Sequence, residues 1–118
     1  MRALSKTSIN QIYKNGHHLY TKSFTIKWLD SGNGCPEIRL LISVPKKSVK
    51  KAVDRNYIKR IIRESYKINR PFICKLFPHP VDIVLIYNKT TVSTFNKLKI
   101  ELLTLFELVS KKQHEINQ

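Results

Sequence analysis

The side chains best suited to do chemistry in this sequence are basic, and they are concentrated in residues 46–67. This segment holds nine of the 22 Lys and Arg residues of the chain but only two acidic residues, Asp54 and Glu64. A dense group of ammonium and guanidinium groups favours the binding of phosphates or of another polyanion. The segment is therefore the first candidate for a binding site.

From Lys51 to near 67–69 the segment predicts an amphipathic helix, because no Gly or Pro interrupts it. A helix turns by about 100° per residue, which separates polar from apolar side chains. The polar side would hold Arg55, Asn56, Lys59, Arg60 and Arg63. The apolar side would hold Tyr57, Ile58, Ile61, Ile62 and Ser65. We expect the apolar side to pack on a core and the polar side to face solvent.

Two interpretations of the polar side remain open. Most charged helix faces are only solvated, but they usually mix both signs, because like charges repel one another. Here the excess is almost entirely positive and continues into the preceding loop, so we favour binding of a polyanion such as nucleic acid. The predicted binding residues are Lys46, Lys47, Lys50, Lys51, Arg55, Asn56, Lys59, Arg60 and Arg63.

The same segment resembles the helix that is typical of the bacterial ribonuclease P protein family. The resemblance rests on Lys47, Ala52-Val53, Arg55-Asn56, Lys59-Arg60 and Arg63-Glu64. It extends over most of the chain through the length, the basic charge and the order of elements. The sequence departs from the family pattern at Lys50, where Gly is usual, and at Tyr57, where a third basic residue is usual.

The resemblance implies a function and further site residues. In this family the RNA subunit holds the catalytic centre, and the protein subunit assists removal of the 5′ leader from precursor tRNA. A cleft between the basic helix and the sheet receives the single-stranded leader, and aromatic side chains line it. The matching positions here are Tyr13 and one of Phe24 and Trp28. For Phe24 and Trp28, plain packing in the core is an equal alternative.

The sequence contains no convincing catalytic constellation. Its eight carboxylates are dispersed, and no pair is spaced to hold two metal ions. A cleavage base at His17 or His18 is a minor alternative. Cys35 and Cys74 match no zinc-binding spacing and are expected to be reduced. We expect no catalytic residue, metal or cofactor in the protein alone; the resemblance implies magnesium for the RNA–protein holoenzyme.

Composition limits the class of protein. The 118 residues suffice for one domain with one hydrophobic core, and a hydrophobic fraction of 42% argues against disorder. A net charge of +14 suits nucleic acid or an anionic membrane surface. No run approaches the roughly 18 apolar residues of a membrane span. Because residues 1–6 contain no apolar signal core, we expect a cytoplasmic protein.

Shorter patterns predict the elements that precede the basic helix. Residues 5–14 predict a helix that stops near Gly16. Alternating apolar residues predict strands at 24–28 and 37–44, joined through a turn at 30–34 into an antiparallel hairpin. A break in either run could add an extra short strand.

The elements after the basic helix follow from apolar runs and prolines. Residues 70–80 contain three Pro and predict a loop with at most one short helical turn. The nearly continuous apolar run 81–87 predicts a central strand that is covered on both faces. A last helix is expected at about 93–112, with 113–118 as a loose tail. Its buried stripe would hold Leu98, Leu102, Leu105 and Val109.

These patterns together predict one α+β domain over residues 1–118, built as a mixed sheet of about four strands with helices packed on one face. The order of elements is αββ(β)αβα. If the strands that flank the basic helix are parallel, they form a βαβ unit, whose default hand is right. The family resemblance implies the rarer left-handed crossover.

The leading functional hypothesis is the protein subunit of ribonuclease P, with the RNA subunit and the leader of precursor tRNA as partners. The alternative is a ribosomal or other RNA-binding module with no role in cleavage. The dispersed carboxylates disfavour a stand-alone nuclease, and a DNA-reading helix would need base-reading side chains and usually a dimer. We expect no membrane partner, and a monomer within the ribonucleoprotein.

Overall fold

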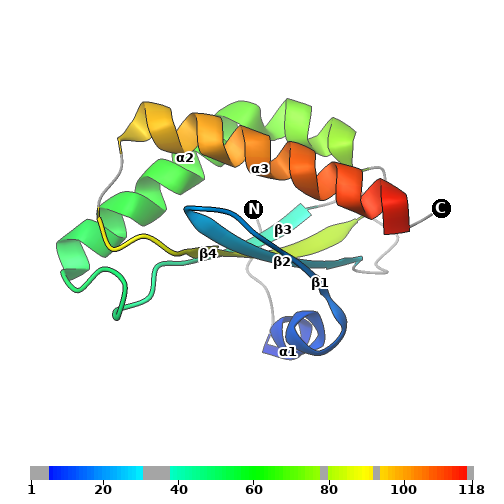
Figure 1. Cartoon of the computed structure of the whole chain (residues 1–118), viewed down its shortest axis with the longest axis horizontal. Coiled ribbons are helices and arrows are strands. Elements are labelled where there is room, and N and C mark those ends of the chain that lie inside the picture. The colour runs from blue at the N-terminus through cyan, green and yellow to red at the C-terminus, as the bar shows by residue number, and fades with distance from the viewer. Residues whose placement is uncertain (1–5, 31–37, 78–79, 92–93, 117–118) are drawn as a thin grey trace.

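A four-stranded β-sheet with helices on both faces forms the centre of the computed structural model (Figure 1). The structure describes residues 6–30, 38–77, 80–91 and 94–116. Its elements are α1 (Lys6–Asn15), β1 (His17–Tyr20), β2 (Phe24–Asp30), β3 (Ile38–Ser43), α2 (Ala52–Leu76), β4 (Val81–Tyr87) and α3 (Phe95–Ile116). Helices α2 and α3 pack together on one face, and α1 lies on the other (Figure 1). The α+β fold with a mixed sheet is therefore as predicted, but the expectation of helices on one face only is wrong, because α1 covers the other face.

The strand order is β1-β2-β4-β3. Strand β2 pairs antiparallel with both β1 and β4, whereas β3 pairs parallel with β4. The predicted hairpin between the strands at 24–28 and 37–44 is therefore wrong, because β4 lies between them. β2 forms its hairpin with β1 (His17–Tyr20), which lies before the first predicted strand, in a segment for which the sequence predicted no strand. The apolar run of β4 takes one of the two inner positions of the sheet, where both of its faces are covered.

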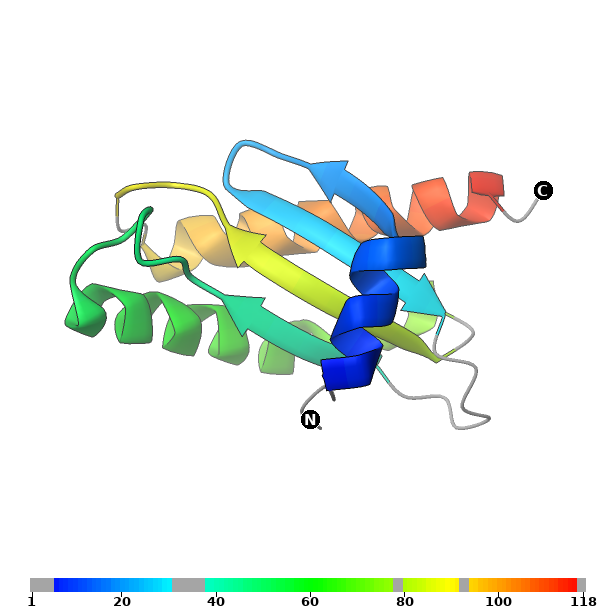
Figure 2. The same cartoon turned by 90° about the horizontal axis from the view of Figure 1, so that it is seen from below.

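The β3–α2–β4 segment forms the expected βαβ unit, since β3 and β4 are parallel neighbours. In Figure 2 both strands point to the left with α2 behind them, and β4 lies above β3. This arrangement is a left-handed crossover, the rarer hand. The loop before α2, the β1–β2 turn and the segment after β4 all lie at the same end of the sheet (Figure 2). The predicted turn at 30–34 lies almost entirely outside the described residues.

Helix α2 is longer than the sequence indicated. It spans 25 residues and continues through Pro71, so the loop predicted for 70–80 begins only after Leu76. A proline inside a helix lacks the amide hydrogen and costs about 3 kcal/mol. Pro71 lies on the exposed side of α2, whereas Ile73 is fully buried. Burying a side chain such as Ile73 contributes about 1.5–3 kcal/mol, so tertiary packing extends a helix that the local sequence would end.

Helix α3 covers the sheet beside α2. Its predicted stripe is confirmed, because Leu98, Leu102, Leu105 and Val109 are all at most 1% exposed. The helix continues to Ile116, so residues 113–116 are helical where a loose tail was predicted. None of the helices in the described part of the chain is long and apolar enough to cross a membrane.

Two hydrophobic clusters hold the layers together. The larger one fills the space between the sheet and the pair α2 and α3, and the smaller one lies under α1, where Ile12 packs on Val84. Val84 therefore identifies the sheet face that α1 covers. Directly paired residues of neighbouring strands share a face, so the register assigns the other sheet residues to one face or the other.

Candidate nucleic-acid interface

The basic side of α2 faces away from the core, as predicted. Asn56, Arg60 and Arg63 are exposed and Lys59 is half-buried. The opposite side is buried through Ile58, Ile61, Ile62 and Ser65. One shallow hollow on this surface is lined by Val53, Asn56, Tyr57, Lys59, Arg60 and Arg63. The structure thus gathers four of the predicted binding residues on one open surface.

Tyr57 belongs to this surface, although the sequence placed it on the apolar side. The residue is 41% exposed, and the guanidinium carbon of Arg60 lies 5.8 Å from the centroid of its ring. This distance permits a cation–π interaction. At 100° per residue, Tyr57 lies at the edge of the apolar side of the helix. At such an edge the neighbouring elements determine whether a side chain is buried or exposed. The ring offers a stacking surface beside the cationic groups.

The loop between β3 and α2 presents the remaining predicted lysines. Lys46, Lys47, Lys50 and Lys51 are all exposed. The carbonyl of Pro45 accepts hydrogen bonds from the amides of Ser48 and Val49, at 3.1 and 3.0 Å. Val44 and Val49 anchor the loop in the core at 5% and 3% exposure. The folded turn between the two buried anchors therefore carries two exposed ammonium groups, and the two residues that follow it carry two more.

Arg55 points differently from the other predicted residues. Its Nη1 donates to the carbonyl of Val49 at 2.9 Å and to the carbonyl of Lys50 at 2.7 Å. The sequence placed the Arg55 charge on the open polar side of the helix. The structure instead directs this guanidinium toward its own loop, and the residue is half-buried.

The basic surface continues along α2 beyond the residues that the sequence predicted. Lys67 and Arg70 are exposed and lie, at 100° per residue, on the same side as Arg63. Arg70 was missed because it fell inside the loop predicted from the prolines. Extending the helical projection of the basic residues beyond Asn69 would have placed Arg70 on this side.

Neither Phe24 nor Trp28 lines a surface cleft. Both are fully buried in the large cluster, on the sheet face covered by α2 and α3. The prediction that one of them joins Tyr13 in a leader cleft is therefore wrong, and the alternative of core packing holds. The register explains this, because Trp28 and Phe24 are paired with Ile83 and Tyr87, which are also buried in that cluster.

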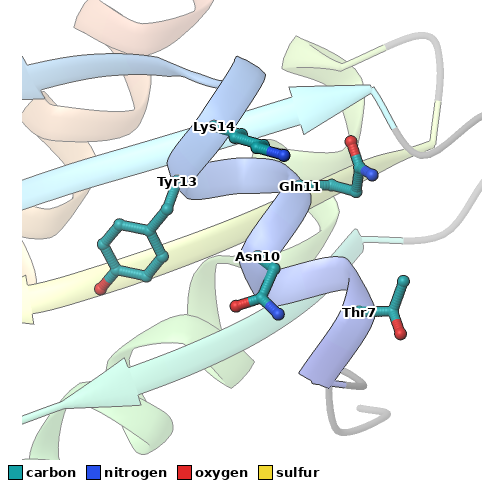
Figure 3. Close-up of a pocket in the computed structure, with 5 residues that line it drawn as sticks. All are labelled: Thr7, Asn10, Gln11, Tyr13 and Lys14. Carbon is teal, nitrogen blue, oxygen red and sulfur yellow. The ribbon is translucent and has the colours of Figure 1, made fainter.

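Tyr13 lies on the opposite side of the sheet, on α1. It is 53% exposed, and Nζ of Lys27 lies 4.3 Å from the centroid of its ring. A hollow along α1 is lined by Thr7, Asn10, Gln11, Tyr13 and Lys14. Figure 3 shows the Tyr13 side chain on one side of the helix, away from Thr7 and Gln11. This hollow carries a single basic side chain, so it is a weaker anion site than the surface of α2.

Tyr20 is an exposed aromatic residue that the sequence did not single out. It pairs with Thr25, which pairs with Ile86, and Ile86 packs in the cluster under α1. Tyr20 therefore lies on the same sheet face as α1 and is 65% exposed. The ring of His18 lies 5.3 Å from the Tyr20 ring. Exposure alternates along His17–Tyr20, with His18 and Tyr20 exposed. Recognition of this segment as a strand would have placed these two rings on one face.

The histidines and carboxylates show structural contacts. His17 packs against Trp28 at 5.6 Å between ring centroids. Asp82 is buried and forms an ion pair with Arg39. In the described part of the chain, no three His, Cys, Asp or Glu side chains gather as ligands for a metal ion. Cys74 is exposed and free, whereas Cys35 lies outside the described residues.

Comparison with known proteins gives a consistent assignment. Residues 1–110 match the family model described as Ribonuclease P. The ribonuclease P protein component of Vibrio campbellii is 30% identical over 118 residues, which cover all of this chain and 89% of that protein. The component of Pseudoalteromonas atlantica is 43% identical over 67 residues, or 57% of this chain. Several curated relatives are matched over only about half of their own length; for the Pseudoalteromonas atlantica protein this share is 54%.

Solved structures share the fold. The RNase P protein of Staphylococcus aureus has a TM-score of 0.75 at 28% identity, over 90% of this chain and 92% of that chain. The RNase P protein of Thermotoga maritima has a TM-score of 0.73 at 28% identity, over 90% of this chain and 96% of that chain. With the family match over residues 1–110, these similarities show that the chain belongs to the ribonuclease P protein family.

Proposed function

We propose that this protein is the protein subunit of ribonuclease P and acts with a catalytic RNA in the cytoplasm. In this role it assists the endonucleolytic removal of the 5′ leader from precursor tRNA. The observation that carries the proposal is the one-sided basic surface of α2 and its preceding loop, in a chain that belongs to this family. We further propose that the protein is a monomer within the complex and has no membrane partner.

The basic surface is suited to the RNA backbone. Arg60 and Arg63 can each make bidentate, charge-assisted hydrogen bonds to phosphate oxygens, and Lys59 adds a further cation. Asn56 offers an amide to a base or a phosphate. Each phosphate that is neutralised releases counterions, so binding should weaken steeply with salt.

The face of the sheet beside α1 is the proposed site for the unpaired leader. Tyr13 and Tyr20 are exposed on this side of the protein, and Lys27 supplies a cation between the strands and α1. Stacking of a base on an aromatic ring contributes roughly 1–3 kcal/mol and tolerates any base. Such a site suits a leader of variable sequence. The β1–β2 turn, which directly follows Tyr20, and the 44–51 loop lie at the same end of the sheet (Figure 2), so we expect one RNA strand to reach both.

We assign catalysis and the magnesium ions to the RNA subunit. Within the described residues the protein offers no cluster of metal ligands, and this supports the assignment. The chain itself would bind, orient and neutralise RNA.

The test is a reconstitution. The purified protein, a bacterial ribonuclease P RNA and a precursor tRNA are mixed at a low magnesium concentration at which the RNA alone is slow, and the cut is mapped. Cleavage at the mature 5′ end that needs both components is the expected result. Tight RNA binding without rescue would favour a general RNA-binding module, and cleavage by the protein alone would favour a nuclease.

A pair of matched variants sharpens this test. The double variant Arg60→Gln and Arg63→Gln removes two charges from the basic surface of α2. The double variant Lys97→Gln and Lys111→Gln removes the same charge from exposed positions of α3. Rescue should fall with the α2 variant and persist with the α3 variant. Equal losses would show that net charge, rather than the α2 surface, drives the rescue.

A further inference from the structure

Three consecutive carbonyls at the start of α2 accept hydrogen bonds from one residue. The Nη1 of Arg55 bonds the carbonyls of Val49 at 2.9 Å and Lys50 at 2.7 Å. The main-chain amide of Arg55 bonds the carbonyl of Lys51 at 3.0 Å. Arg55 is thus the hydrogen-bonding centre of the chain entering the helix.

The usual device for fixing a helix start is missing here. The N-cap residue is Lys51, and it makes no side-chain capping hydrogen bond. Ser, Thr, Asp and Asn are the residues that normally supply such a bond. Here the Arg55 guanidinium fixes the helix start instead, by donating to the two carbonyls that precede the N-cap residue. Because a hydrogen bond from a charged donor is about twice as strong as a neutral one, the hold is firm.

The segment fixed in this way carries the lysines of the interface. Lys46 and Lys47 are exposed on a turn whose ends are buried at Val44 and Val49, and Lys50 is exposed directly after that turn. Nη1 gives its two hydrogens to these two carbonyls, so a phosphate that took Nη1 would displace the loop from it. Nε and Nη2 remain as donors. The geometry therefore gives the Arg55 guanidinium a part in holding the loop.

We propose that Arg55 is a positioning residue, which holds the 44–51 loop in the shape that presents its lysines to RNA. Arg55 contributes to RNA binding through the loop. The proposal rests on the RNA-binding function proposed above, and it gives Arg55 a different role from Arg60, one and a half turns further along the same helix.

The first test uses the free protein. Amide hydrogen exchange of Ser48 and Val49, whose amides bond the carbonyl of Pro45, reports on the loop. We expect Arg55→Gln to speed exchange of these amides by roughly tenfold or more, because two charge-assisted hydrogen bonds are lost. The matched variant Arg60→Gln should leave them unchanged. Unchanged exchange in Arg55→Gln would overturn the proposal.

The second test uses binding to a bacterial ribonuclease P RNA. The loop variant carries three substitutions, Lys46→Gln, Lys47→Gln and Lys50→Gln. Arg55→Gln and Arg60→Gln are each measured alone and in combination with this loop variant. If Arg55 acts through the loop, its loss of affinity should nearly vanish in the loop variant, a coupling of about fivefold or more. Arg60→Gln should lower the affinity by the same factor in the wild-type protein and in the loop variant. Additive losses for Arg55 would identify it as a direct phosphate contact.

Two further measurements keep the outcomes distinct. Arg55→Lys keeps the charge without the guanidinium. Full recovery of affinity with this variant while the Ser48 and Val49 amides still exchange fast would show that charge alone suffices and would overturn the proposal. If the wild-type protein does not bind the RNA, the proposed function fails, together with the RNA part of this inference. The exchange measurement would still establish whether Arg55 holds the loop.

Discussion

Arg39 and Asp82 form an ion pair with two hydrogen bonds across the parallel strands β3 and β4. Arg39 Nε donates to Oδ1 and Nη2 donates to Oδ2 of Asp82, both at 2.7 Å. The same Nη2 lies 3.4 Å from Oγ of Ser8 on α1. Asp82 is only 5% exposed, so this pair is largely desolvated. It joins the parallel half of the sheet to the helix that carries Tyr13.

Removing the Asp82 charge should destabilise the protein. Asp82→Asn keeps the side-chain shape but leaves the Arg39 guanidinium without its counter-charge, which should lower the free energy of unfolding by about 3 kcal/mol. Urea denaturation followed by circular dichroism measures the change. Glu107→Gln, at an exposed position of α3, is the control and should change the stability by less than about 0.5 kcal/mol. Equal effects of the two variants would mean that the pair adds little to stability.

Replacing Pro71 should stabilise α2. Pro71→Ala supplies an amide for the helical hydrogen bond and relieves the steric clash of the ring, at an exposed position. We expect the free energy of unfolding to rise by roughly 1–3 kcal/mol in urea titrations. A decrease would indicate that a bend at Pro71 is needed to seat Ile73 in the core.

The exposed tyrosines should act only on an unpaired leader. Tyr13→Ala and Tyr20→Ala should each weaken binding of precursor tRNA by about 1–3 kcal/mol, because a stacking surface is lost. Binding of mature tRNA should not change. Tyr→Phe at either position keeps the ring and should retain most of the affinity. A variant that weakens both RNAs equally would rule out a leader-specific role for that tyrosine.

Trp28 offers a contrasting result. Because it is fully buried, Trp28→Ala should lower the free energy of unfolding by about 3–5 kcal/mol. Where the folded variant is still populated, any loss of affinity should be the same for precursor and mature tRNA. A loss confined to precursor tRNA in the folded variant would contradict a purely structural role.

The basic surface should extend past the predicted binding residues. Arg60→Gln and Arg70→Gln should each reduce the slope of log affinity against log salt by roughly 0.7–0.9, the effect of one lost phosphate contact. Lys97→Gln on α3 removes one charge elsewhere and should leave the slope unchanged. If Arg70→Gln behaves like Lys97→Gln, the RNA surface ends before the last turns of α2.

Patterns along the sequence were sufficient for the faces of individual elements. The spacing of Ile58, Ile61 and Ile62 showed which side of α2 is buried, and the continuous apolar run of β4 showed that both of its faces are covered. Such patterns are reliable because burial repeats every two residues in a strand and every 3.6 in a helix. The excess of Lys and Arg likewise indicates a polyanionic partner from the sequence alone, because net charge depends on composition and not on the path of the chain.

The tertiary structure decided what each face packs against. Alternation placed Phe24 and Trp28 on one side of a strand, but only the pairing of β2 with β4 shows that α2 and α3 cover that side. Pro71 stays helical because Ile73 is buried among residues that are distant in sequence. The direction of the Arg55 side chain depends on the path of the preceding loop. Periodicity along the chain records which side chains leave water, but their partners come from other segments, and only the folded chain brings those segments together.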